Sequence, residues 1–337
     1  MRIAIVGATG NLGTALLRRL EGEESAEVVG IARRAPRPDS SEYRGATWKE
    51  IDVASSAAPR QLREAFAGVD AVVHLAWAIQ PSHDPAFQRL VDVGGTAKVL
   101  EAAADSGVGQ VLVASSVGAY SAAPKSERVD ESWPTGGLHT STYSMHKAAN
   151  ERALDVFEAE HLEIVVTRLR PGIVFQKAAA TEIAGLFAGP RYPTRWLRAV
   201  RPPVLPLPRT MIFQAVHADD VADAFWRAID RRAGGAFNIA AEPVLTPQRI
   251  ADLVGARWIP APTGLIRSLV TATWHLRLQR TDAGWIDIAT NVPVMSTERA
   301  REVLGWEPTR TAEDAFRELL SGLADRTTKA GSPPLRG

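Results

Sequence analysis

The sequence predicts an α/β protein in which a Rossmann-type, doubly wound parallel sheet is joined to a smaller, mostly C-terminal substrate-binding domain. Through the first two-thirds of the 337 residues, short β-branched runs alternate with longer amphipathic stretches. This alternation is typical of parallel strands joined by crossover helices. The first run leads directly into a glycine-rich turn, and after residue 175 the chain becomes rich in Pro, Arg and Trp. We therefore expect two domains.

The strands and helices are expected to alternate in order along the chain. Strands are predicted at 2–6, 28–32, 71–75, 110–115 and 164–170, and helices at 12–20, 59–66, 91–106 and 143–160. A further helix and strand are predicted at 216–228 and 236–240. The expected division is a Rossmann domain from 1–175 with 213–240, a substrate-binding domain or lid from 176–212 with 241–325, and a flexible tail at 326–337.

The first strand runs into the turn Gly7-Ala8-Thr9-Gly10-Asn11-Leu12-Gly13, which opens a helix. A strand, a glycine turn and a helix N-terminus form a site for a pyrophosphate, because the backbone approaches closely and the helix dipole favours negative charge. The predicted contacts are Gly7, Thr9, Gly10, Asn11, Leu12 and Gly13. The spacing is GxxGxxG rather than GxGxxG, so a turn that serves only helix–strand packing is the alternative.

The second strand ends in Arg33 and Arg34 with no acidic residue. At this place an acid usually binds the ribose 2′-hydroxyl of NAD, whereas an arginine meets the 2′-phosphate of NADP. The pattern favours NADP, with Arg33 as the main contact, Arg34 as a helper and NAD as the alternative. Arginine makes up 33 of the 39 basic residues, so composition alone is a competing explanation.

A hydroxyl residue and a Tyr/Lys pair are the candidate catalytic groups. Ser116 follows the fourth predicted strand, where ligands bind in open α/β sheets. Tyr143 and Lys147 stand four residues apart on a predicted helix, so they share one face. There the ammonium can lower the pKa of the tyrosine from about 10 and make it a proton donor and acceptor. A chance pair and a strand-end turn serine are the structural alternatives.

Composition excludes several other classes of function. The net charge of +1 gives no strong field for nucleic acid or an acidic membrane, and no apolar run approaches the roughly 20 residues of a membrane helix. The absence of cysteine removes disulfides and thiolate chemistry, and the seven histidines show no metal-ligand spacing. We expect a cytoplasmic protein without a metal, whose partner is a small-molecule substrate. The apolar helix expected at 265–278 suits a lid or a subunit contact better than a membrane surface.

Together these motifs resemble the extended short-chain dehydrogenase/reductase family, which includes the NAD-dependent epimerases and dehydratases. The resemblance extends to about residue 320 and includes the motifs Val93-Gly94-Gly95-Thr96, Val216-His217-Ala218-Asp219-Asp220, Phe237-Asn238-Ile239-Ala240 and Leu304-Gly305-Trp306-Glu307-Pro308. It implies that Tyr143 is the general acid/base, that Lys147 contacts the nicotinamide ribose, and that Ser116 orients the substrate oxygen. It also implies cofactor contacts from Asp52, Val53, Leu75, Ala76, Trp77, Pro171, Gly172 and Ile173, and a homodimer.

Departures from the family pattern bear on the substrate. Phe213 stands where relatives that act on sugar nucleotides carry an arginine for the diphosphate, and no asparagine follows Arg170-Pro171. Val117-Gly118 replaces the Asp-Glu of the sugar dehydratases, and Asp92 replaces an asparagine of the cofactor side. These changes favour an NADPH-dependent ketone reductase or alcohol dehydrogenase with a medium-sized, fairly apolar substrate. A nucleotide-sugar epimerase with tightly bound NAD is the alternative, and a non-catalytic dinucleotide sensor a further one.

Overall fold

A seven-stranded parallel sheet forms the centre of the molecule. The computed structural model describes the chain except for residues 38–42, 44, 80–82, 181–202, 280 and 326–337. The strand order is β11-β7-β5-β4-β1-β2-β3, and the strands are β1 (Arg2–Val6), β2 (Glu27–Ala32), β3 (Ala46–Glu50), β4 (Ala71–His74), β5 (Gln110–Ala114), β7 (Val165–Pro171) and β11 (Gly235–Ile239). The chain reverses direction across the sheet between β1 and β4, which is where this fold binds its ligands. The predicted Rossmann-type fold is confirmed.

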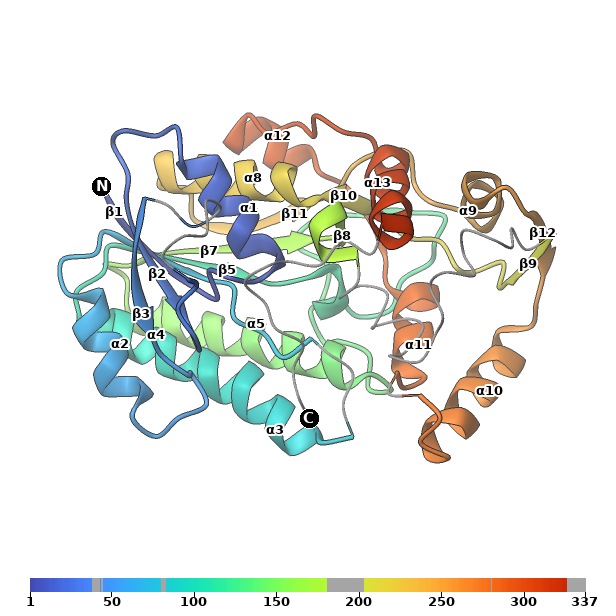
Figure 1. The fold of residues 1–337 in the computed structure, drawn as a ribbon, viewed down its shortest axis with the longest axis horizontal. Coiled ribbons are helices and arrows are strands. Elements are labelled where there is room, and N and C mark those ends of the chain that lie inside the picture. The colour runs from blue at the N-terminus through green and yellow to red at the C-terminus, as the bar shows by residue number, and fades with distance from the viewer. Residues whose placement is uncertain (38–42, 44, 80–82, 181–202, 280, 326–337) are drawn as a thin grey trace.

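Helices cover both faces of this sheet (Figure 1). One face carries α1 (Asn11–Leu20) and α8 (Ala218–Asp230), and the other carries α2 (Ala58–Phe66), α4 (Gly95–Asp105) and α5 (Thr142–Glu160). Alternate residues of β1 enter the two cores, Ile3 and Ile5 on one side and Ala4 and Val6 on the other. Because both faces are buried, the strand reads as a continuous apolar run.

The sequence analysis missed β3 and misplaced the start of two helices. β3 is an edge strand that pairs only with β2 and is largely exposed, so Ala46–Glu50 shows no apolar run. The helix expected at 91–106 begins earlier, as α3 (Pro85–Arg89) and a π-helical turn, η2 (Leu90–Gly94), before α4. The segment 216–228 begins in a short strand, β10 (Ala215–His217), and becomes helical only at Ala218.

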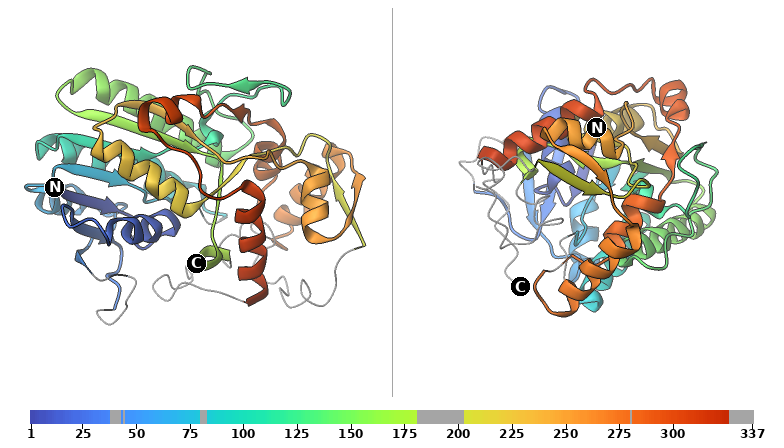
Figure 2. Two further views of the ribbon diagram at one scale, coloured as in Figure 1. Left: turned by 90° about the horizontal axis from the view of Figure 1, so that it is seen from above. Right: turned by 90° about the vertical axis from the view of Figure 1, so that its right-hand side faces the viewer.

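The remaining described elements lie beyond the carboxyl ends of the strands or pack beside α8. Three short parallel pairs join distant segments: β8 (Ile173–Phe175) with β10, β9 (Val204–Leu207) with β12 (Arg257–Pro260), and β6 (Arg128–Val129) with β13 (Val294–Met295). The helices are α9 (Pro247–Val254), α10 (Thr263–His275), α11 (Gly284–Asn291), α12 (Glu298–Leu304) and α13 (Ala312–Asp325), with single turns η3 (Val117–Ala119) and η4 (Lys177–Ala179). Figure 2 shows α9, α10 and α11 gathered at one end of the sheet. The domain division stays a prediction.

Helix α10 lies where the sequence predicts an apolar helix, and none of its residues is buried. Leu265 and Leu269 are 66% and 64% exposed. Among the described residues, no helix has both the length and the apolar character needed to cross a membrane. Most of the Pro-, Arg- and Trp-rich segment and all of the predicted tail lie outside the described residues.

A buried ion pair fastens α5 to the sheet. The guanidinium of Arg170 on β7 donates two hydrogen bonds, of 2.9 and 2.8 Å, to the carboxylate of Glu151 on α5. Ser115 donates to the same carboxylate, and Arg170 also donates to Tyr120. Burial alone would raise the pKa of Glu151, but the hydrogen bonds and charge of Arg170 outweigh it and lower that pKa. Glu151 therefore stays ionised in the interior.

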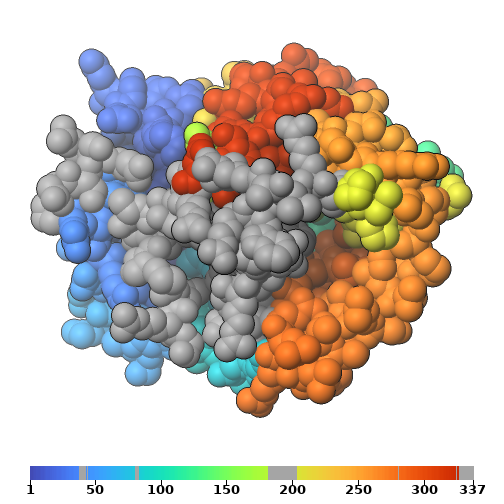
Figure 3. Space-filling view, turned by 45° about the vertical axis from the view of Figure 1, so that its right-hand side comes forward, coloured from blue at the N-terminus to red at the C-terminus, as the bar shows by residue number. Residues whose placement is uncertain are grey.

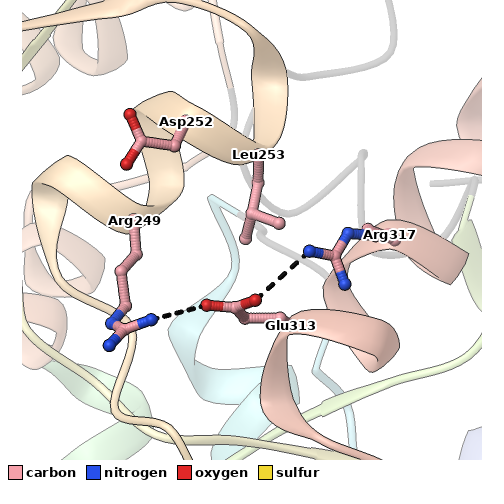
Figure 4. Close-up of a pocket in the computed structure, with 5 residues that line it drawn as sticks. All are labelled: Arg249, Asp252, Leu253, Glu313 and Arg317. Atoms are coloured by element: carbon pink, nitrogen blue, oxygen red, sulfur yellow. Dashed lines mark hydrogen bonds and ion pairs between the residues drawn. The ribbon is translucent and has the colours of Figure 1, made fainter.

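An exposed pair provides a contrast. In a shallow depression between α9 and α13, Glu313 accepts from Arg249 at 2.7 Å and from Arg317 at 3.2 Å, beside Asp252 and Leu253 (Figure 4). The Arg249 side chain is 48% exposed, whereas that of Arg170 is 5% exposed. Water screens the exposed pair, so it joins two helices with little gain in stability.

Replacing Arg170 by Ala is expected to lower the free energy of unfolding by about 3–5 kcal/mol, because the buried Glu151 carboxylate loses its two-pronged partner and keeps only Ser115 and the longer contact to Arg168. Arg249→Ala removes the same side chain from an exposed pair and is expected to cost less than about 1 kcal/mol. Urea denaturation of both variants measures the difference. Equal losses would show that the buried pair does not hold α5 in place.

Candidate active site

The glycine turn packs tightly against the end of β4. Gly7 has a φ of +90°, its N–H donates to the carbonyl of Ile31, and a Cβ there would lie 2.6 Å from the backbone nitrogen of Ala76. A Cβ on Gly13 would lie 2.4 Å from the carbonyl oxygen of Gly7. Only glycine fits at either position. The turn thus brings the start of α1 beside the residues that follow β4.

The N-terminus of α1 has the character of an anion site. Its N-cap residue, Gly10, provides no side chain to cap the helix, and the first turn holds no acidic residue. The first N–H groups of a helix need acceptors, and the helix dipole favours a negative one. Together with the glycine cradle, these features fit the pyrophosphate of a dinucleotide.

Gln176, which the sequence analysis did not single out, lies at this turn. Its amide nitrogen donates to the carbonyl of Asn11 at 2.8 Å and also contacts the Asn11 side-chain oxygen. Its carbonyl accepts from Arg18 on α1 at 3.0 Å. Gln176 follows β8 and is 165 positions from Asn11, so no local pattern pointed to it.

The predicted adenosine contacts lie beyond the ends of β2 and β3. Arg33 and Arg34 follow β2 and are exposed. The carboxylate of Asp52 accepts from the backbone of Ala54, and Val53 packs against Gly95. The structure adds Glu50, whose carboxylate accepts from the N–H of Ala35 at 2.9 Å. The sequence analysis found no acid at the end of β2, and this one comes from the unpredicted neighbouring strand.

The predicted contacts at the other strands also lie at the carboxyl edge of the sheet. Leu75 and Ala76 follow β4, and the N–H of Leu75 donates to the carbonyl of Val6. Pro171 ends β7, and Gly172 packs so closely on Gln214 that a Cβ would lie 2.5 Å from its carbonyl oxygen. Thr9 belongs to the turn, Leu12 lies in the first turn of α1, and Ile173 begins β8. All of these cofactor-binding roles stay predictions.

Tyr143 and Ser116 meet at the end of β5. Ser116 is the N-cap residue of the turn η3, and its hydroxyl and the ring of Tyr143, in the first turn of α5, both lie close to Gly118. A Cβ on Gly118 would lie 2.9 Å from the Tyr143 ring, so glycine is needed where the turn meets the phenol. Burial raises the pKa of Tyr143 to about 12; the hydrogen bond from Ser116 opposes this, and the charge of Asp92 adds to it.

Lys147 is buried one helical turn further along α5. Its ammonium donates to the carbonyl of Ala114 at 2.7 Å and lies 3.4 Å from the centre of the Trp77 ring, but 5.8 Å from that of Tyr143. Burial lowers the pKa of Lys147 to about 7, against the charges of Asp92 and Glu151. The expectation that this ammonium lowers the pKa of Tyr143 is wrong for this structure, because burial dominates and the ammonium faces Ala114 and Trp77.

Asp92, the residue that departs from the family pattern, links three parts of the site. It is 2% exposed, and one carboxylate oxygen accepts from the N–H of Ala78 at 2.7 Å. The other lies 3.0 Å from Nδ1 of His146, and the main-chain carbonyl accepts from Asn150. Asp92 thus joins the π-helical turn, the segment after β4 and the helix of Tyr143 and Lys147.

A pocket opens beside Tyr143 between two tryptophans. The ring centre of Tyr143 lies 5.7 Å from that of Trp77 and 5.1 Å from that of Trp285 on α11. The described lining consists of Trp77, Ala78, Ile79, Gln88, Asp92, Thr142, Tyr143, His146, Asp282 and Trp285. The sequence analysis placed Trp77 on the cofactor side and missed Asp282 and Trp285, which come from the C-terminal part of the chain.

Known proteins resemble this chain in sequence and in fold. The model of a family described as the NAD dependent epimerase/dehydratase family matches residues 3–240. The 3-diazoavenalumate denitrifying reductase of a Streptomyces species is 28% identical, over 92% of this chain and 96% of its own length. The UDP-glucose 4-epimerase of Mycolicibacterium smegmatis is 27% identical, over 91% and 94%.

An uncharacterized protein of Mycobacterium tuberculosis is 26% identical over 97% of this chain, which spans only 30% of that protein's length. Among solved structures, UDP-glucose 4-epimerase of Thermus thermophilus with NAD has a TM-score of 0.69 at 22% identity, covering 96% of this chain and 99% of that one. The Thermotoga maritima enzyme with UDP-glucose has a TM-score of 0.71 at 19% identity, covering 97% and 99%. At these identities the structures support the fold alone.

Dinucleotide binding is expected to weaken as the pH rises through about 7, the pKa of Lys147, because the ammonium is then lost. Asp92→Asn removes a negative charge that raises the pKa of Lys147. In this variant the loss of dinucleotide affinity is therefore expected at a lower pH. Fluorescence titration with NADPH between pH 5.5 and 9 (roughly two units on either side) measures both curves. Lys147→Met is the control and is expected to lack the transition; an unchanged curve in Asp92→Asn would contradict the electrostatic role of Asp92.

Proposed function

The chain belongs to the NAD dependent epimerase/dehydratase family, and we propose that it is an NADP(H)-dependent oxidoreductase that interconverts a carbonyl and an alcohol. The proposed substrate is a medium-sized, fairly apolar small molecule. The observation that carries this proposal is the meeting of Ser116, Tyr143 and Lys147 at the carboxyl edge of the sheet, beside a pocket lined by tryptophans.

The proposed chemistry is proton transfer by the protein and hydride transfer by the cofactor. When bound, the nicotinamide supplies or accepts the hydride. With a pKa of about 12, Tyr143 is protonated at neutral pH and is ready to donate a proton to the oxygen of a carbonyl undergoing reduction. Ser116 orients that oxygen through its own hydroxyl, beside that of Tyr143. Lys147 holds the nicotinamide ribose.

The preference for NADP rests on the residues that follow β2. Arg33 and Arg34 are exposed and form no ion pair among the described residues, so a 2′-phosphate can reach them. The carboxylate of Glu50, at the end of the neighbouring strand, already accepts the N–H of Ala35. A ribose 2′-hydroxyl would compete for that carboxylate, whereas a 2′-phosphate meets two guanidinium groups.

The substrate proposal rests on Trp77, Ile79 and Trp285 in the lining of the pocket, and on Phe213, which lies outside that lining. Phe213, which replaces the diphosphate-binding arginine, packs with an apolar cluster that includes Phe175 and Leu245. The alternative, a nucleotide-sugar epimerase with tightly bound NAD, is favoured by the similarity to UDP-glucose 4-epimerases. A reductase is similar to this chain over a comparable length and at a comparable identity, and this similarity favours the oxidoreductase proposal. A dinucleotide sensor without catalysis would have no use for the assembled Ser116, Tyr143 and Lys147.

The cofactor proposal predicts that NADPH binds at least about ten-fold more tightly than NADH, since each charge-assisted hydrogen bond to a phosphate contributes on the order of 1.5–3 kcal/mol. Arg33→Ala is expected to remove most of this preference and to leave NADH binding unchanged. Fluorescence titration measures both constants, after mass spectrometry has tested for copurified cofactor. Copurified NAD, with conversion of UDP-glucose to its epimer, would establish the alternative.

The catalytic proposal predicts that Tyr143→Phe lowers kcat by about 10²–10⁴-fold, because it removes the proton donor. The dissociation constant for NADPH and the thermal midpoint are expected to stay close to those of the wild type. Tyr43→Phe removes the same hydroxyl from a buried ring packed on Trp48, remote from the pocket, and is the matched control. Steady-state rates of NADPH oxidation measure both variants; full activity of Tyr143→Phe would exclude the role given to Tyr143.

A further inference from the structure

We propose that Trp77 and Trp285 form a two-sided aromatic clamp that selects a flat aromatic ring, uncharged or cationic, whose carbonyl lies at Tyr143. This inference rests on the proposed function and deepens it by naming the class of substrate. The two tryptophans are 208 positions apart in the sequence and come from the segment after β4 and from α11. Figure 3 shows residues of these two halves of the chain, blue to cyan and orange, on opposite sides of one face of the molecule.

The geometry around Tyr143 is aromatic on two sides. Trp77 stands edge-on to the phenol, with an interplanar angle of 71°, and Trp285 is tilted toward it at 36°. Both indoles are only partly buried, so each retains surface that faces the pocket. A planar ring placed against these indoles makes offset or edge-to-face contacts while its carbonyl substituent lies beside the phenol. A saturated ring is thicker and lacks a π-face, so it fits less well.

Trp77 is held in place before any substrate binds. The ammonium of Lys147 lies 3.4 Å from the centre of its ring, which is a close cation–π contact. The next residue, Ala78, donates its N–H to the buried carboxylate of Asp92. Contacts from two elements therefore fix the backbone and the ring of Trp77, and a preorganised site loses less entropy on binding.

Trp285 is held by the way α11 meets α5. A Cβ on Gly284 would lie 2.8 Å from the Cα of Ser141, the N-cap residue of α5, so the two helix starts are in direct contact. The N–H of Gly284 donates to Asp282 at 2.7 Å, and Asp287 in the same helix pairs with Arg267. The tryptophan that follows Gly284 is thus positioned by the helix that carries Tyr143.

The charge of the described lining favours a neutral or cationic ring. This described lining contains the carboxyl groups of Asp92 and Asp282 and no lysine or arginine side chain. Burial raises the pKa of Asp282, the hydrogen bond from the N–H of Gly284 opposes this, and the charge of Asp287 adds to it. The two carboxyl groups give a diphosphate no cationic partner within this described lining. A neutral or cationic aromatic compound needs no such partner.

The test compares acetophenone with cyclohexyl methyl ketone, which carry the same acetyl group on an aromatic and a saturated ring. We expect kcat/KM with NADPH to be at least about ten-fold higher for acetophenone, and this ratio to approach one in Trp77→Leu and Trp285→Leu, since the aromatic contacts are lost. Trp258→Leu, on β12 with its indole N–H bonded to the carbonyl of Leu207, is the matched control and is expected to keep the wild-type ratio. An unchanged ratio in both clamp variants would overturn the proposal.

Binding measurements separate the clamp from the proposed function. Saturation-transfer NMR reports binding of both ketones and of UDP-glucose to the NADPH-loaded protein without turnover. If neither ketone is reduced, the oxidoreductase proposal fails, and the clamp is judged on binding alone. Preferential binding of acetophenone that is lost in Trp285→Leu supports the clamp. Binding of UDP-glucose in preference to both ketones, or binding of acetophenone that Trp285→Leu leaves unchanged, rejects it.

Discussion

The buried ion pair between Glu151 and Arg170 is the interaction on which the arrangement of the site depends. Glu151 lies one helical turn after Lys147 on α5, and its carboxylate binds both Arg170 on β7 and Ser115 at the end of β5. Two strands and one helix therefore meet at a single carboxylate. An ionised carboxylate in the interior is unfavourable without these partners. The pair therefore favours one position of α5 along its axis relative to the sheet. That position places Tyr143 beside Ser116.

A second carboxylate, Asp92, contacts the same helix through His146. It binds the segment that carries Trp77 through the N–H of Ala78, and it binds α5 through His146. Asp92 thus supports the catalytic helix and one wall of the substrate pocket together. Its charge also opposes the effect of burial on Lys147. Asp92 lies in the π-helical turn and also lines the pocket. The same residue therefore belongs to the irregular turn of the helix and to the chemistry of the pocket.

Several features could be predicted because they depend on residues close together in the sequence. The turn from Gly7 to Gly13 follows a strand and opens a helix, and Tyr143 and Lys147 share a face because a helix has 3.6 residues per turn. Other features depend on distant residues and gave no local pattern. Gln176 contacts Asn11 from 165 positions away, and the edge strand β3 lacks an apolar run because much of it faces water. The pKa of Tyr143 likewise follows from burial, which spacing does not reveal.

The sequence by itself determined the Rossmann-type sheet, the glycine turn at its first strand and the pairing of Tyr143 with Lys147, since local periodicity and spacing encode them. Only the tertiary structure decided what surrounds those groups. Trp285 and Asp282 reach the pocket because α11 packs on the start of α5, and Lys147 faces Trp77 and Ala114 rather than the phenol. The physical reason is that burial, charge and ring contacts arise between side chains that are far apart in the chain and meet only after it has folded.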